Sequence, residues 1–146
     1  MMKRMAIMLG LIVVAICAQA QVSSLDEAQT LAKKDGKLIL LKFSGSDWCA
    51  PCIQLQKVII DDPAFTSFAN QKLLLLLADF PRQKKNKLPK EQQEKNDQLA
   101  EKYNPEGEFP YMVLLDADGK VLHKWSGFDK KQTVQDYVTE ISRYTK

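Results

Sequence analysis

Residues 38–52 read Leu-Ile-Leu-Leu-Lys-Phe-Ser-Gly-Ser-Asp-Trp-Cys-Ala-Pro-Cys, and this stretch decides the fold. Its first part, residues 38–43, is an almost continuous apolar run of strand length, which is typical of a strand covered on both faces of a sheet. Residues 44–47 break that run, and apolar residues with helical spacing follow from about Cys49. The sequence therefore predicts a buried strand, a turn and a helix, with Cys49 at the turn.

The two cysteines of this stretch suit thiol–disulfide exchange. A helix N-terminus offers unpaired backbone N–H groups and the positive end of the dipole, which favour the thiolate of the first cysteine. We expect Cys49 to attack a disulfide and Cys52, one turn further on, to resolve the mixed disulfide. Pro51 in the first turn costs no helix hydrogen bond and limits the flexibility of the loop, and Ala50 keeps the loop small.

Residues 1–20 have the three parts of a secretion signal. They are a basic start at residues 3–4, an apolar run over residues 5–17 and a small residue, Ala20, at the exit. The apolar run is shorter than the roughly 20 residues that cross a bilayer core, which argues against a permanent anchor. We expect cleavage after Ala20 and export to the periplasm. Lipid attachment at Cys17 and retention of the segment as an anchor stay open.

Length and charge indicate one domain that does not bind nucleic acid. The chain has 146 residues, of which 45% are hydrophobic and 27% charged, and this is enough for one core. We place that domain at residues 21–146. The net charge of +3 falls to +1 once the two basic residues of the signal are removed. Capture of nucleic acid needs a surplus of Lys and Arg on one face, so we expect no such partner.

Cysteine usage argues against a disulfide scaffold and against a metal site. Without Cys17 the chain keeps two cysteines, both in one four-residue window. A small exported domain stapled by disulfides would spread several along the chain. A structural zinc site normally needs four ligands, and only Cys49, Cys52 and His123 are available. We expect no metal and no cofactor, with copper on the two thiolates as the remaining alternative.

The other elements follow from periodicity and turn chemistry. The sequence predicts a first helix from Leu25 to Asp35, with a capping box of Ser24 and Glu27, and a short helix that begins at Pro63. A buried strand at residues 73–77 and a helix at residues 89–103 follow. The sequence then predicts antiparallel strands at residues 111–116 and 120–125 and a last helix capped by Asp129. Parallel pairing early and a hairpin late imply an α/β fold with a mixed sheet between helical layers.

The segment at residues 48–52, placed after a buried strand, resembles the active site of the thioredoxin family, with Ala50 in place of the usual Gly. The resemblance extends to Phe109-Pro110 ahead of the hairpin and covers about residues 24–146. It implies a thioredoxin fold, in which a central mixed β-sheet is flanked by helices on both faces. Residues 45–49 and 79–82 are more similar to the exported thioredoxin-like proteins of bacteria than to cytosolic thioredoxin.

The resemblance also implies roles for residues near the cysteines. Pro110 would be a cis proline that faces the cysteines, and the backbone of Phe109 would pair with an extended substrate segment. Trp48 would contact substrate. The blander alternatives are a trans Pro110 at a strand edge and a Trp48 that only packs.

Two residues depart from the family pattern. Lys42 stands in the strand where thioredoxin has a buried acid that helps to move the proton of the resolving thiol, which leaves Lys42, Asp47 or water for this step. Tyr111 replaces the usual Thr after the proline, so the substrate groove would differ. We assign His123 no role, and we expect the Lys-rich residues 82–102 to be a solvated loop and helix, with a docking face for an acidic partner as the alternative.

The activity implied is exchange of dithiol and disulfide states with protein disulfide substrates. Ala50-Pro51 is more similar to the Gly-Pro of reducing family members than to the Pro-His of oxidising ones, which favours a reductase. A reductase in an oxidising compartment implies a membrane electron donor, and we expect a monomer. An oxidase or isomerase on the same residues, and a binding module with a structural disulfide, remain alternatives.

Overall fold

The computed structural model of the chain describes residues 21–145. The predicted signal segment, with Cys17 and the cleavage point, lies outside the described residues. The helices are α1 (Leu25–Asp35), α2 (Ala50–Leu55), the π-helical η1 (Gln56–Ile60), α3 (Pro63–Lys72), the 3₁₀ turn η2 (Lys84–Asn86), α4 (Lys90–Tyr103) and α5 (Val134–Ser142). The strands are β1 (Leu38–Ser44), β2 (Leu73–Asp79), β3 (Tyr111–Leu115) and β4 (Val121–Ser126). Within residues 21–145, no helix combines the length and apolar character that crossing a bilayer requires.

The strands form one mixed sheet in the order β2-β1-β3-β4. Strand β1 pairs with β2 in parallel, with Leu40 opposite Leu75, and with β3 antiparallel, with Leu40 opposite Leu114. Strands β3 and β4 form the predicted antiparallel hairpin. The central strand is buried from Ile39 to Ser44, as its continuous apolar run predicted.

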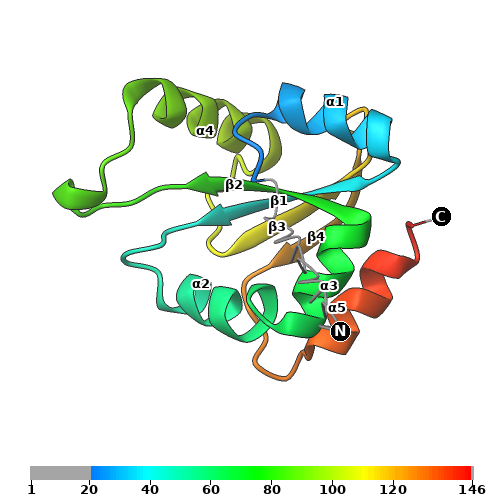
Figure 1. Ribbon diagram of the computed structural model, residues 1–146. Coiled ribbons are helices and arrows are strands. Elements are labelled where there is room, and N and C mark those ends of the chain that lie inside the picture. The colour runs from blue at the N-terminus through cyan, green and yellow to red at the C-terminus, as the bar shows by residue number, and fades with distance from the viewer. Residues whose placement is uncertain (1–20, 146) are drawn as a thin grey trace, which may run out of the picture.

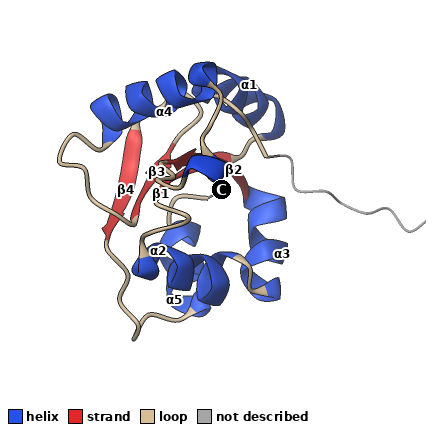
Figure 2. Ribbon diagram, turned by 90° about the vertical axis from the view of Figure 1, so that its left-hand side faces the viewer, coloured by secondary structure: helices blue, strands red, loops and turns tan. Residues whose placement is uncertain are grey.

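Helices cover both faces of this sheet, so the predicted layering is confirmed (Figure 1; Figure 2). Helices α1 and α4 lie on one face, where Ile39, Leu41 and Phe43 of β1 are buried. Helices α2, α3 and α5 lie on the other face, where Leu40 packs in a second cluster. Because successive side chains of a strand point to opposite faces, odd-numbered and even-numbered residues of β1 face different helical layers.

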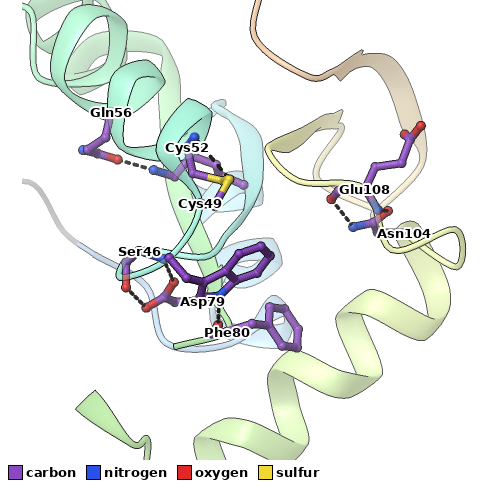
Figure 3. Close-up of a disulfide and its surroundings, with 10 residues drawn as sticks. Ser46, Cys49, Cys52, Gln56, Asp79, Phe80, Asn104 and Glu108 are labelled. Atoms are coloured by element: carbon purple, nitrogen blue, oxygen red, sulfur yellow. Dashed lines mark hydrogen bonds between the residues drawn. A yellow bond between two sulfur atoms is a disulfide. The ribbon is translucent and has the colours of Figure 1, made fainter. Parts of the chain in front are cut away.

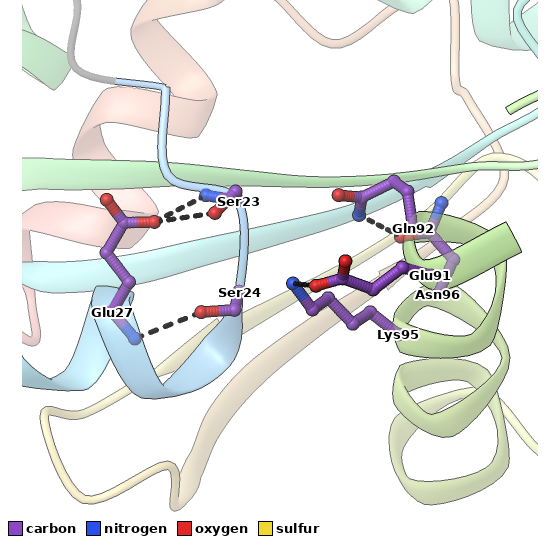
Figure 4. Close-up of polar contacts among 7 residues, drawn as sticks. All are labelled: Ser23, Ser24, Glu27, Glu91, Gln92, Lys95 and Asn96. Carbon is purple, nitrogen blue, oxygen red and sulfur yellow. Dashed lines mark hydrogen bonds and ion pairs between the residues drawn. The ribbon is translucent and has the colours of Figure 1, made fainter. Parts of the chain in front are cut away.

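The start of α1 differs in one detail from the predicted capping box (Figure 4). The Ser24 hydroxyl accepts a hydrogen bond from the Glu27 N–H at 3.2 Å, as predicted. The Glu27 carboxylate accepts instead from the backbone N–H and the hydroxyl of Ser23, at 2.8 and 2.9 Å. The backbone N–H of Ser23 is the main cause that lowers the pKa of Glu27. The helix is capped, but the reciprocal contact lies one residue earlier.

The predicted cap of the last helix is wrong. Helix α5 begins at Val134 with Thr133 as its cap, not at Asp129. The Thr133 hydroxyl accepts from the Asp136 N–H, and the Asp136 carboxylate accepts from the Thr133 N–H at 2.7 Å. Asp129 instead accepts from the Lys131 N–H within a separate turn. Thr133 and Asp136 satisfy each other's donors, which Asp129 and Gln132 do not do.

We predict that Thr133→Ala destabilises the protein by about 1 kcal/mol, because it removes the hydroxyl that accepts from the Asp136 N–H and donates to the Asp136 carboxylate. Asp129→Ala is the matched control and should cost less than about 0.5 kcal/mol, since it loses a single exposed hydrogen bond in a turn. The measurement is the free energy of unfolding in urea. A larger loss for Asp129→Ala than for Thr133→Ala would contradict this description of the helix start.

Candidate active site

The two cysteines form a disulfide at the carboxyl end of β1, where α2 begins (Figure 3). Cys49 is the cap of α2, and its Sγ accepts a hydrogen bond from the Cys52 N–H at 3.3 Å. Pro51 occupies the first turn of the helix. The predicted position of Cys49 at a strand-to-helix turn is confirmed. A backbone donor at a helix N-terminus therefore points at the sulfur of Cys49.

The two cysteines differ in exposure. In the disulfide form Cys49 is 5% exposed and Cys52 is 1% exposed. Cys52 lies inside the first turn of α2, while Ala50, next to Cys49, is exposed. Both cysteines are buried in the disulfide form, and Cys52 is the more enclosed of the two.

The loop before Cys49 is anchored to the chain that leaves β2 (Figure 3). The backbone N–H and the hydroxyl of Ser46 donate to the Asp79 carboxylate at 2.9 and 2.5 Å. The indole N–H of Trp48 donates to the Phe80 carbonyl at 2.7 Å. These contacts join residues more than 30 positions apart and hold the loop on both sides of residue 47.

Asp47 forms a third anchor with the loop at residues 82–86. Its carboxylate accepts from the backbone N–H groups of Arg82 and Gln83, at 2.9 and 3.0 Å, and from the side chain of Asn86 at 2.9 Å. The Arg82 N–H is the largest cause that lowers the pKa of Asp47. The Asp47 carboxylate is therefore ionised, and its oxygens are hydrogen-bonded to this loop.

Trp48 is half-buried, and its ring packs against three neighbouring residues. A methyl group built on Gly45 would lie 2.3 Å from the indole, so only glycine leaves room for this ring. The guanidinium carbon of Arg82 lies 3.6 Å from the centre of the Trp48 ring. The ring of Phe109 meets Trp48 edge-on, with centroids 5.4 Å apart. Trp48 is partly exposed, and its contact with substrate stays a prediction.

The segment Phe109-Pro110 lies beside Trp48, and the peptide bond between Phe109 and Pro110 is cis, as the resemblance implied. The Phe109 ring contacts both Trp48 and Phe80. The side chain of buried Asn104 donates to the Glu108 carbonyl at 2.9 Å and accepts from the Glu108 N–H at 3.0 Å (Figure 3). Asn104 thereby fixes the turn that leads into this segment.

Lys42 lies under the active-site helix. Its parity in β1 matches that of Leu40, so its side chain points to the face covered by α2 and η1. Its ammonium donates to the side chain of Gln56, the residue four positions after Cys52 whose own N–H donates to the Cys52 carbonyl (Figure 3). The Gln56 amide donates in turn to the Asp61 carboxylate at 2.6 Å.

Burial controls the titration of Lys42. The residue is only 9% exposed, and burial lowers its pKa to about 8, although the charges of Asp61 and Asp79 act in the opposite direction. A fraction of Lys42 is therefore in the neutral amine form near neutral pH, which is unusual for a lysine.

The structure places His123 away from these groups, on β4. Its ring contacts Trp125, with centroids 4.5 Å apart, and its Nδ1 lies 3.4 Å from the Tyr144 hydroxyl. Among residues 21–145, no three His, Cys, Asp or Glu side chains are grouped so that they could hold a metal ion.

Several residues of the site were not assigned a place from the sequence. They are Gly45, Ser46, Asp79, Arg82 and Asn104. A short Asp- and Ser-rich loop next to a cysteine signals local hydrogen bonding, but the partners lie on another strand and its loop. Tertiary contacts over such separations leave no pattern of spacing in the chain.

Comparisons with known proteins identify a matching family and similar structures. A family model described as a thioredoxin-like domain matches residues 25–142. Disulfide bond reductase DsbH of Chlamydia pneumoniae is 42% identical over 112 residues, which cover 77% of this chain and 65% of that relative, so the chain spans less than two thirds of its length. A solved structure of a DsbH oxidoreductase has a TM-score of 0.75 at 37% identity and covers 86% of this chain and 84% of that chain. A disulphide isomerase from Xylella fastidiosa Temecula1 shares the fold, with a TM-score of 0.58 at 22% identity, covering 79% of this chain and 86% of the other.

We predict that Lys42→Met stabilises the oxidised protein at pH 7 by about 1–3 kcal/mol, because a buried amine that is harder to protonate than in the unfolded chain opposes folding. In the folded protein the pKa of Lys42 is about 8, below the ordinary 10.5. Between pH 8 and pH 10.5 the unfolded state therefore binds more protons than the folded state. The unfolding free energy of the parent should therefore rise from about pH 8 to 10.5 relative to that of the variant. Urea unfolding at three pH values measures this rise.

The matched control for this prediction is Lys34→Met, which changes an exposed lysine of α1. It should leave the pH dependence of stability unchanged. If the parent and Lys42→Met differed by the same free energy at pH 7 and pH 10.5, the depressed pKa of Lys42 would be refuted.

Proposed function

Because the chain belongs to the thioredoxin-like domain family, we propose that it is a thiol–disulfide oxidoreductase that acts on protein disulfides. The observation that carries this proposal is the pairing of Cys49 and Cys52 at the start of α2, with a backbone N–H aimed at the sulfur of Cys49. A purely structural disulfide would not need that donor or a cap position. The roles below extend this proposal to individual residues.

The reduced enzyme starts with Cys49 as a thiolate. Its sulfur attacks one sulfur of the substrate disulfide, the substrate S–S bond breaks, and the other substrate sulfur leaves as a thiolate and takes up a proton. Cys52 then attacks the Cys49 sulfur of the mixed disulfide and expels the second substrate sulfur. The substrate gains two electrons and two protons, and the enzyme is left with the Cys49–Cys52 disulfide that the structure contains.

Resolution requires Cys52 to lose its proton inside the protein. Lys42 is the best placed acceptor of the three considered, because it is buried on the same face and its hydrogen bond to Gln56 keeps it along the helix of Cys52. Its amine can be neutral near physiological pH. Asp47 is less suited, since its carboxylate is held by the loop at residues 82–86.

Trp48, Phe109 and Pro110 are proposed to bind substrate. Trp48 and Phe109 form one aromatic surface that continues into the cis peptide bond before Pro110. An extended substrate segment would pair with the backbone of Phe109 while its disulfide approaches Cys49. Binding through backbone groups and an apolar surface explains how the site could accept substrates of many different sequences.

The direction we propose is reduction, in the periplasm. It is supported by the Ala50-Pro51 pair and by the relative named a disulfide bond reductase. Residues 1–20 would be the export signal and residues 21–146 the working domain, acting as a monomer without cofactor. In that compartment a membrane electron donor must restore the dithiol.

We predict that Cys49→Ser lowers the reduction of insulin disulfides by dithiothreitol to the uncatalysed rate, a loss of about a hundredfold or more, because the attacking sulfur is gone. Cys52→Ala should instead accumulate a mixed disulfide on Cys49 that mass spectrometry detects. An active Cys49→Ser variant would leave the binding-module alternative.

A redox titration against glutathione tests the direction separately. The reductase proposal expects a Cys49–Cys52 potential below about −220 mV, nearer to thioredoxin than to the strongly oxidising enzymes. A value near −120 mV would assign the protein to the oxidases instead.

A further inference from the structure

A cluster of positive charge adjoins the active-site loop. Residues 82–87, which we call the basic loop, contain Arg82, Lys84, Lys85 and Lys87, and the sequence has no acidic residue from 80 to 90. All four basic side chains are exposed. In a mature chain with a net charge of only +1, this is a marked local concentration.

The basic loop is fixed to the active-site loop and does not stand apart from it. The carboxylate of Asp47 holds the loop at its first residues and at Asn86, and the Gln83 side chain donates back to the Asp47 carbonyl at 3.2 Å. Asp47 lies two residues before Cys49. The position of the positive charge relative to the reactive sulfur is therefore set by the backbone.

Arg82 connects this charge with the proposed substrate surface. Its guanidinium stacks on Trp48 at 3.6 Å, and Trp48 in turn contacts Phe109. Arg82 stays exposed in this stack. A guanidinium held over an aromatic ring is pre-organised to bind a carboxylate with its free N–H groups.

Acidic groups around the site are distributed unevenly. Asp47 and Asp79 lie beneath the basic loop, and their carboxylates accept hydrogen bonds from it and from Ser46. Two further acidic residues, Glu106 and Glu108, are exposed in the turn ahead of Phe109. The basic loop and the turn ahead of Phe109 thus carry opposite charge, so charge can help to orient a bound polypeptide.

We propose that the basic loop selects polypeptide substrates that carry Asp or Glu within a few residues of the cysteine under attack, with Arg82 as the carboxylate contact beside Trp48. This inference rests on the proposed thiol–disulfide exchange and names its substrate class. Exposed rim charges mainly raise the rate of association and fix the orientation. The preference should therefore appear in kcat/KM and weaken with salt.

The test uses three peptides with the same internal disulfide, flanked by Glu, Gln or Lys residues, and follows their reduction by the pre-reduced full protein. The parent should reduce the Glu peptide about tenfold faster in kcat/KM than the Gln peptide at low salt, with the Lys peptide slowest. Raising the ionic strength to about 0.5 M should remove most of this difference, because the Debye length shrinks to a few ångströms.

Two variants locate the effect. Lys84→Gln/Lys85→Gln/Lys87→Gln should lose most of the preference for the Glu peptide and keep the parent rate on the Gln peptide, and Arg82→Gln should lower the Glu-peptide rate further. A control, Lys34→Gln/Lys120→Gln, removes two exposed lysines at the opposite end of β1 and β3 and should keep the preference.

The outcomes separate this inference from the proposed function. Equal kcat/KM on all three peptides, or a preference that survives in the triple variant, would overturn the selection by charge while leaving the exchange activity intact. Failure to reduce any of the peptides would overturn the proposed function itself.

Discussion

The proposed chemistry depends on one interaction, the hydrogen bond from the Cys52 N–H to the Cys49 sulfur at the start of α2. It exists because β1 ends at Ser44 and the chain turns into a helix within five residues. A helix begins with backbone donors that have no partner inside the helix, and here one of them meets a sulfur. The same donor would stabilise a thiolate on Cys49 after reduction.

The surrounding structure keeps that turn in place. Ser46, Asp47 and Trp48 are each hydrogen-bonded to the chain that follows β2, and Gly45 leaves room for the indole. The turn is therefore a rigid part of the domain, although it is a loop. The same turn holds Trp48, the residue before Cys49, in contact with Arg82 of the basic loop and with Phe109.

Local features of the sequence predicted most of the fold. The apolar run of β1, the turn of the hairpin and the pair of cysteines before a helix are all readable over short windows. The last helix shows the limit of such patterns, because Asp129 and Thr133 both have a polar residue three positions later and only Thr133 forms the box. The contacts of Asp47 join it to residues about 35 positions away, so no local pattern predicted them.

The most direct measurement is the pH dependence of Cys49 alkylation by iodoacetamide in the reduced Cys52→Ala variant, which keeps the backbone N–H at position 52. We expect the pH of half-maximal reactivity to lie well below the pKa of a free cysteine thiol, about 8.5, and to return to that value when the same variant is unfolded in urea. Identical midpoints in the folded and unfolded protein would contradict a sulfur activated by the helix N-terminus.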